Sequence, residues 1–136
     1  MKVFVDASAI VAMIGREPEA TAFGRVISHS SQCITSPIAW WEAVRAIARV
    51  RRVDMDEAKT LVEDFLRDAN VEWVDINDTD ANAAIDAHAR FGKGVHPAGL
   101  NMGDCFAYAS TRRHADTILF KGEDFARTDL KDATLA

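Results

Sequence analysis

The sequence predicts an α/β fold in which a mostly parallel β-sheet carries helices on both faces. Two observations support this prediction. Short apolar runs typical of buried strands alternate with longer segments of helical periodicity, and capping residues mark where several helices begin. Strands separated by helices are joined by right-handed crossovers, which make neighbouring strands parallel. A chain of 136 residues with 49% apolar side chains fits one domain, residues 1–136.

Four apolar segments are predicted to be strands. The first is a continuous apolar run, as in strands buried on both faces of a parallel sheet, whereas the third has apolar residues at alternate positions. The predicted strands are Lys2–Val5, Cys33–Thr35, Val71–Ile76 and Thr117–Phe120. The last residues of the chain are predicted to add at most a marginal strand.

Six segments between these strands are predicted to be helices. Ser36 followed by Pro37 is a typical helix start, and Asp54 with Glu57 resembles a capping box. The predicted helices cover Ala7–Met13, Pro18 to Ser28, Pro37 to about Arg52, the segment after Asp54, a segment capped by Asp78 or Thr79 that runs through Arg90, and Met102 or Gly103 to Arg113. The glycine-rich stretch GKGVHPAGLNMG is predicted to be a loop.

Composition and charge narrow the class of protein. The net charge of −5 argues against a broad basic surface that coats nucleic acid, so contact with RNA needs a local basic patch or a bound cation. Cys33 and Cys105 lack metal-site spacing and are predicted to be reduced and buried. Asp6 interrupts the N-terminal apolar run and no long apolar stretch follows, so we expect a cytoplasmic protein without a membrane segment.

Four acidic residues are predicted to lie near one edge of the sheet. They are Asp6 and Asp124 after apolar strands, Glu42 in the helix after the second strand, and Asp104 at the start of the last helix. Each has an ordinary explanation when taken alone: a helix cap, a surface ion pair, a dipole contact or a turn. Because ligand sites of parallel sheets lie beyond the carboxyl ends of the strands, we expect the four side chains to converge.

Four carboxylates in one cleft need a positive partner. Their charges repel and favour protonation unless a cation lies among them. An all-oxygen ligand set favours Mg²⁺ or Mn²⁺ over zinc. Such an ion lowers the pKa of a bound water and stabilises charge on a phosphodiester oxygen. The acids therefore predict a divalent-metal site.

Four segments together resemble the PIN-domain ribonucleases, and more closely the VapC toxins of bacterial toxin–antitoxin pairs. The segments are FVDASAI with Asp6, IAWWEAV with Glu42, LNMGDCFAYA with Asp104 and LFKGEDF with Asp124. The resemblance covers essentially the whole chain in order and spacing. The combination of the last two segments is specific, whereas the opening aspartate alone is not.

This resemblance implies a three-layer α/β/α sandwich and an endoribonuclease that uses one or two Mg²⁺ or Mn²⁺ ions. Asp6, Glu42 and Asp104 match the core acids of the family, and Asp124 matches a fourth, more variable position. Ser8 and Asn101 match neighbours that orient the carboxylates and order metal-bound water. The resemblance also implies inhibition by a cognate antitoxin and assembly as a homodimer.

Basic residues near the second acid are the candidates for contact with RNA. One polar side of the predicted helix carries Glu42, Arg45, Arg49 and Arg52. The arginines are either a solvated surface or contacts to phosphate, and Lys121 either contacts phosphate or balances local charge. Trp40 lies on the apolar side and is predicted to pack in the core. Trp41 borders the polar side, where it is placed to anchor a protein partner.

Three alternative functions use a similar fold and charge. A receiver-like signalling domain also binds Mg²⁺ through acids on a parallel sheet, but it needs an acid pair beside Asp6 and a phosphoacceptor that Asp75 fits poorly. A phosphohydrolase with an aspartate nucleophile needs a second acid two positions later, where this chain has Ser8. The third alternative is a PIN-like fold that has lost catalysis and only binds a partner.

Overall fold

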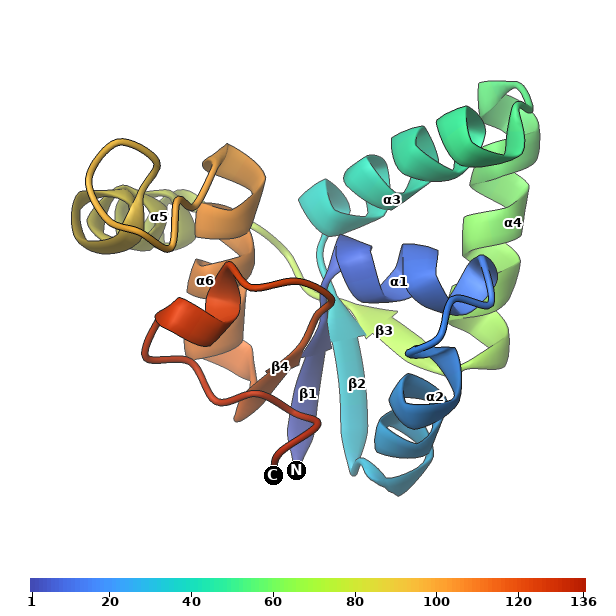
Figure 1. The fold of residues 1–136 in the computed structure, drawn as a ribbon, viewed down its shortest axis with the longest axis horizontal. Coiled ribbons are helices and arrows are strands. Elements are labelled where there is room, and N and C mark those ends of the chain that lie inside the picture. The colour runs from blue at the N-terminus through green and yellow to red at the C-terminus, as the bar shows by residue number, and fades with distance from the viewer.

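The computed structural model describes all 136 residues and contains a four-stranded parallel sheet between two layers of helices (Figure 1). The strands are β1 (Lys2–Val5), β2 (Gln32–Thr35), β3 (Val71–Trp73) and β4 (Thr117–Leu119), in the spatial order β3-β2-β1-β4. The helices are α1 (Ala7–Ile14), α2 (Ala20–His29), α3 (Pro37–Arg51), α4 (Met55–Asp68), α5 (Asp78–Phe91) and α6 (Met102–His114), with a 3₁₀ turn η1 (Phe125–Arg127). The predicted α/β fold is confirmed.

Alternate residues of the central strand β1 face two separate hydrophobic cores. Val3 and Val5 pack with α1 to α4, whereas Phe4 packs with α5 and α6. Figure 1 shows the same division, with α1 to α4 on one side of the sheet and α5 and α6 on the other. Burial on both faces explains why this strand is a continuous apolar run. Cys33 and Cys105 lie in different cores and are unpaired.

The carboxyl ends of the strands meet at the edge of the sheet where three helices begin. The parallel register pairs Val5 with Leu119, and the next backbone N–H, that of Asp6, donates to the Leu119 carbonyl at 3.0 Å. Ser36 caps α3, its hydroxyl oxygen accepting from the Ala39 N–H at 3.2 Å. In Figure 1, α6 begins at the same edge, opposite the start of α3. The first turns of α1 and α6 and the first two turns of α3 therefore lie close together.

The third strand is shorter than predicted, covering Val71–Trp73 and not Val71–Ile76. β3 lies at the edge of the sheet and pairs only with β2, which ends at Thr35. The Val74 N–H still donates to the Thr35 carbonyl at 2.9 Å, but no residue of β2 remains beyond it. Strand length is thus set by the partner strand. At the other edge, the C-terminal residues add one isolated bridge to Ile118 in place of a marginal strand.

Two helices begin at other residues than predicted. α2 begins at Ala20 rather than Pro18, because the preceding residues form a turn closed by a 2.9 Å hydrogen bond from the Ala20 N–H to the Glu17 carbonyl. α5 is capped by Asn77, not by Asp78 or Thr79. The Asn77 side chain accepts from the Asp80 N–H at 3.2 Å, and the Asp80 carboxylate accepts from the Asn77 N–H at 3.0 Å.

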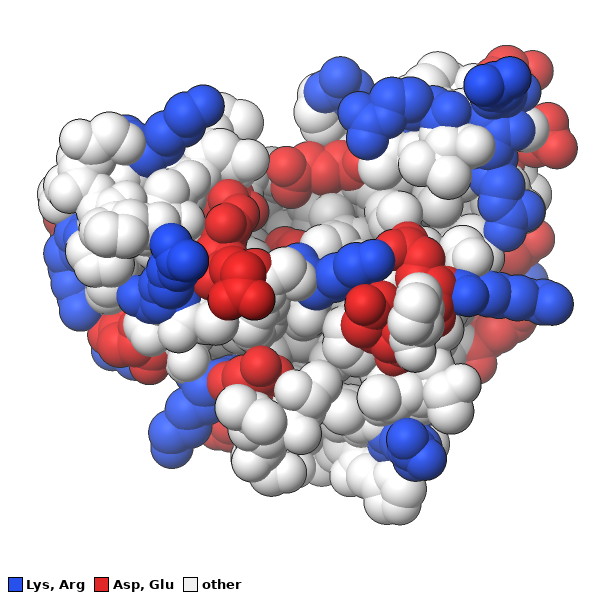
Figure 2. Space-filling view, viewed as in Figure 1, with Lys and Arg blue, Asp and Glu red and all other residues white.

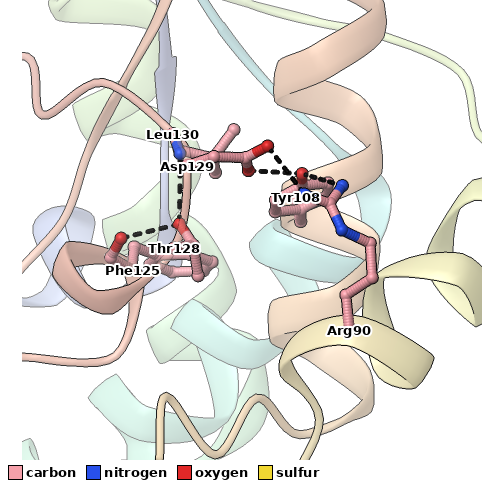
Figure 3. Close-up of polar contacts among 6 residues, drawn as sticks. All are labelled: Arg90, Tyr108, Phe125, Thr128, Asp129 and Leu130. Carbon is pink, nitrogen blue, oxygen red and sulfur yellow. Dashed lines mark hydrogen bonds and ion pairs between the residues drawn. The ribbon is translucent and has the colours of Figure 1, made fainter. Parts of the chain in front are cut away.

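The segment after β4 is fastened to α5 and α6 by a network of polar side chains (Figure 3). The Tyr108 hydroxyl donates to Asp129 at 2.5 Å, and the Arg90 guanidinium donates to Asp129 at 3.0 Å and to the Tyr108 oxygen at 3.2 Å. Asp129 follows the turn η1, which begins directly after Asp124, and the Thr128 hydroxyl between them donates to the Phe125 carbonyl at 2.7 Å. None of the helices combines the length and apolar character needed to cross a bilayer.

Candidate active site

The four predicted acids lie near one another where α3 and α6 begin, beside a hollow that only Glu42 among them lines. Figure 2 shows acidic atoms around this hollow and basic atoms along α3. Their proximity shows in their electrostatics: beyond the effect of burial, Asp6 and Asp104 raise the pKa of Glu42, and Asp124 raises the pKa of Asp6 and Asp104. The structure therefore brings together side chains that are far apart in the sequence.

Asp6 lies at the end of β1 and is held by Ser8. Its side chain is buried, with a relative exposure of 6%. One carboxylate oxygen accepts from the Ser8 hydroxyl at 2.6 Å and from the Ser8 N–H at 3.1 Å, so Asp6 also caps α1. The Ser8 oxygen accepts in turn from the Lys121 N–H at 3.0 Å, which connects the ends of β1 and β4. Burial raises the pKa of Asp6, although both hydrogen bonds lower it.

Asp104 is the third residue of α6 and is held by Asn101. The Asp104 N–H donates to the Asn101 side chain at 2.8 Å, and the Asp104 carboxylate accepts from the Asn101 N–H at 3.1 Å. Burial, and then the charges of Asp6 and Asp124, raise the pKa of Asp104 to about 6, while the hydrogen bond from Asn101 opposes the shift. Asn101, which was predicted to orient a carboxylate, is thus the N-terminal cap of α6 and is hydrogen-bonded to Asp104.

Glu42 reaches the cleft from the second turn of α3. Burial, followed by the charges of Asp6 and Asp104, raises its pKa to about 7, and only Arg45 lowers it. Its carboxylate lies against Gly103, where an added Cβ would be 2.2 Å from Oε2. Sequence reasoning missed this contact. A glycine inside a helix is the signal that could have revealed it.

The cleft has a volume of about 590 Å³ and one basic wall. Arg45 and Arg49 line it from α3, and the Arg45 guanidinium lies 4.9 Å from the centre of the Trp41 ring. Trp41 is half-exposed, whereas Trp40 packs against the core as predicted. Arg52 departs from the predicted polar side, because α3 ends at Arg51 and Arg52 adopts a left-handed conformation with φ of 55°. It does not line the cleft.

Lys121 lines the cleft but is neutralised by two acids. Its ammonium pairs with Glu17 and, at 3.4 Å, with Glu19. Glu17 also lines the cleft. No local pattern predicted that pairing, which joins segments more than a hundred residues apart. Four basic residues were predicted to contact RNA. Of these, Arg45 and Arg49 are the two that line the cleft and form no ion pair.

The acidic side chains suit a hydrated divalent cation. In their observed positions no three side chains of His, Cys, Asp or Glu are close enough together to hold one ion directly. Mg²⁺ commonly keeps several waters and binds through only one or two carboxylates, so this spacing is compatible with it. None of the ion pairs in the protein includes Asp6, Glu42 or Asp104, so only the charge of Arg45 beside Glu42 offsets part of their mutual repulsion.

The chain is similar to known proteins in sequence and in fold. The sequence model of the PIN domain family matches residues 3–131. A VapC ribonuclease of Rhizobium meliloti is 39% identical, over 93% of this chain and 98% of its own length. The crystal structure of Mycobacterium tuberculosis VapC20, described as a "Sarcin-Ricin loop cleaving toxin", has a TM-score of 0.73 at 15% identity, covering 94% of this chain and 95% of that chain. A toxin–antitoxin complex from Klebsiella pneumoniae has a TM-score of 0.69 at 14% identity, covering 93% and 92%.

Strand order distinguishes this fold from the receiver-like alternative. Here β1 lies between β2 and β4, whereas receivers of the flavodoxin-like type place it between the second and third strands. The three-layer α/β/α sandwich implied by the four sequence segments is confirmed, and so is the resemblance itself. The chain belongs to the PIN-domain family and, within it, to the VapC ribonucleases.

Proposed function

We propose that this protein is an Mg²⁺- or Mn²⁺-dependent endoribonuclease and the toxin of a toxin–antitoxin pair. The observation that carries the proposal is the proximity of Asp6 and Asp104 to Glu42, which lines a cleft together with Arg45 and Arg49. Burial of these acids without cationic partners opposes their ionisation, as is common for groups kept for chemistry rather than for stability. The relatives named as VapC ribonucleases support RNA as the substrate.

In this proposal Asp6, Glu42 and Asp104 would hold a hydrated metal ion, in part through its waters, with the exposed Asp124 as a fourth acid nearby. When bound, the ion supplies Lewis-acid stabilisation of phosphate oxygens and a more acidic water. The Ser8 and Asn101 hydrogen bonds keep two of the carboxylates oriented. Arg45 and Arg49 lie along the cleft where the RNA phosphates would pass.

The central test is cleavage of structured RNA by wild type and Asp6→Asn, each with Mn²⁺ or with EDTA. Wild type should cut only with metal, and Asp6→Asn should stay folded but be inactive, because its amide removes the negative charge. Asp68→Asn changes an exposed acid on α4 and serves as the control. Metal-independent cutting, or full activity of folded Asp6→Asn, would refute the assignment. Failure of wild type to cut any RNA would favour a binding module that has lost catalysis.

The arginine wall is tested by the dependence of RNA binding on salt. Arg45→Ala and Arg49→Ala should each weaken binding and reduce the slope of log K against log salt by about one, because each removes a phosphate contact. Arg52→Ala changes the same type of residue directly after the end of α3 and outside the cleft, so it is the control. Equal effects of all three substitutions would show that the cleft wall is not the path of the RNA.

We further propose that a cognate antitoxin inhibits the enzyme in the cytoplasm. The complex from Klebsiella pneumoniae, titled as a toxin–antitoxin complex, supports a partner of this kind. Trp41, which is 52% exposed beside the cleft, is the predicted anchor for that partner. Expression of this protein alone should arrest growth, and co-expression of the small reading frame beside its gene should restore it. Harmless expression without any such neighbour would argue against a toxin.

Finally, we propose a homodimer that forms through the apolar groove between α5 and α6. Ile85 and Met102 line this groove and are 71% and 69% exposed. Adjoining exposed apolar side chains of this size mark interaction surfaces. Ile85→Glu should shift the mass measured by light scattering from dimer to monomer, while Leu135→Glu, at another exposed apolar residue, should not. A monomeric wild type would overturn the proposal.

A further inference from the structure

The three core acids of the site are held in different ways. Hydrogen bonds from Ser8 orient Asp6, and the capping box with Asn101 orients Asp104. Glu42 extends from α3 across the cleft, and its pKa reflects burial and neighbouring charges without any hydrogen bond. A glutamate has several rotatable bonds, so an untethered carboxylate would lose its position to other rotamers.

Gly103 confines the Glu42 carboxylate because it has no side chain. A Cβ at this position would lie 2.2 Å from Oε2 and 2.6 Å from both Cδ and Oε1 of Glu42. The carboxylate therefore occupies the volume that any other residue at this position would fill. Since Gly103 directly precedes Asp104 on α6, the contact also sets how closely the acids of α3 and α6 approach each other.

The backbone does not require a glycine here. Gly103 is helical, and the glycines with positive φ are Gly94, Gly99 and Gly122. Inside a helix, glycine is less favourable than alanine. Gly24 in α2 is helical as well, but an added Cβ there would meet nothing within 4 Å. Among these helical glycines, steric need therefore applies to Gly103 and not to Gly24.

We propose that Gly103 is a positioning residue. Because it has no side chain, it leaves a space, here called the seat, in which the Glu42 carboxylate of α3 packs against the first turn of α6. The inference rests on the proposed function, because the seat matters to activity only if Glu42 and Asp104 act together. A methyl group at position 103 would displace the end of a flexible side chain rather than the backbone. Gly103→Ala should therefore fold well and lose function.

The experiment compares Gly103→Ala with Gly24→Ala, which adds the same methyl group to a helix with open space around it. Gly103→Ala should melt no lower than wild type, yet its kcat for RNA cleavage should fall about 10²-fold, as expected for a misplacement of about 1 Å. Its affinity for Mn²⁺, measured by calorimetry, should fall at least about tenfold. Gly24→Ala should match wild type in kcat and in Mn²⁺ affinity.

A double variant separates a steric seat from a general structural defect. Glu42→Asp shortens the side chain by one methylene, so its carboxylate no longer meets a Cβ at position 103. Gly103→Ala/Glu42→Asp should thus resemble Glu42→Asp alone, and the two losses should not multiply. Multiplied losses, or a Gly103→Ala protein with the activity and Mn²⁺ affinity of Gly24→Ala, would overturn the inference. If wild type cleaves no RNA, the proposed function fails, while the Mn²⁺ affinities still test the seat.

Discussion

Helices α5 and α6 begin with the same local motif and use its acid in opposite ways. α5 opens with Asn77 and Asp80, and α6 with Asn101 and Asp104, each pair closing a capping box. Asp80 is 1% exposed and pairs with Arg113 at 2.6 Å. Asp104 has no cationic partner, and burial together with neighbouring acids raises its pKa to about 6.

A cap therefore determines where a helix begins but not what its acid does. At the start of α5, an arginine from α6 neutralises the carboxylate, so the pair contributes to stability. At the start of α6, β1 and α3 supply further acids, so the carboxylate is held at a cost in stability and is available for chemistry. Substitutions at the two helix starts should therefore differ in their effects on activity and on stability.

Asp104→Asn should lower kcat/KM for RNA cleavage about a thousandfold, which is about 4 kcal/mol of transition-state stabilisation. The free energy of unfolding should not fall, because the substitution removes a repelled charge. Asp80→Asn, at the equivalent position of the other capping box, should leave kcat/KM of the folded protein nearly unchanged. Steady-state kinetics and urea unfolding measure kcat/KM and the free energy of unfolding of both variants. Similar losses of kcat/KM in both would contradict a catalytic role that belongs to Asp104 and not to Asp80.

Asp80→Ala should lower the free energy of unfolding by about 3 kcal/mol, since it leaves Arg113 without its partner and removes the reciprocal cap. The value lies at the low end for a buried pair because the Arg113 side chain is 36% exposed. Lys59→Ala, which breaks an exposed pair with Glu63 at 4.0 Å, should cost less than about 0.5 kcal/mol. Equal losses in urea unfolding would contradict a special role for Asp80.

In EDTA, stability should rise as the pH is lowered from about 7.5 to about 5. The pKa values of Glu42 and Asp104, about 7 and about 6, exceed their ordinary values of 4.5 and 3.8. The folded protein therefore binds more protons than the unfolded chain in this window, and its stability falls as the pH rises. The change should be on the order of 2 kcal/mol after allowance for solvent screening.

The control for this pH dependence is the double variant Glu42→Gln/Asp104→Asn, in which the slope should flatten, while Asp80→Ala should retain it. Mn²⁺ should raise the melting temperature more at about pH 7.5 than at about pH 5, where protons compete for the same carboxylates. A stability that increases with pH in EDTA would show that the acids do not repel one another.

The smallest effects are expected at the two capping asparagines. Asn77→Ala and Asn101→Ala should each cost about 1 kcal/mol of stability, because each removes one cap. Only Asn101→Ala should also slow RNA cleavage, since Asn101 orients an acid of the cleft. Chemical denaturation and initial cleavage rates distinguish the two, and unchanged cleavage by Asn101→Ala would limit Asn101 to a helix cap.

Most of the fold could be predicted because its signals are local. The apolar runs of β1, β2 and β4, the Ser36 cap and the proline after it are readable from neighbouring residues alone. The end of β3 was not predictable in this way, because it depends on where its partner β2 stops at Thr35. The alternation of these elements was enough to predict a parallel sheet and a site at its carboxyl edge.

The sequence alone therefore determined which acids follow strands and which lie at helix starts. These positions were enough to indicate the candidate site. It did not specify their partners. Whether a capping aspartate meets Arg113, as Asp80 does, or other carboxylates, as Asp104 does, depends on segments that are distant in the sequence. The same holds for the seat of Glu42 on Gly103 and for the pairing of Lys121 with Glu17. Charge and steric contacts depend on distances in space, which local periodicity and capping signals do not encode.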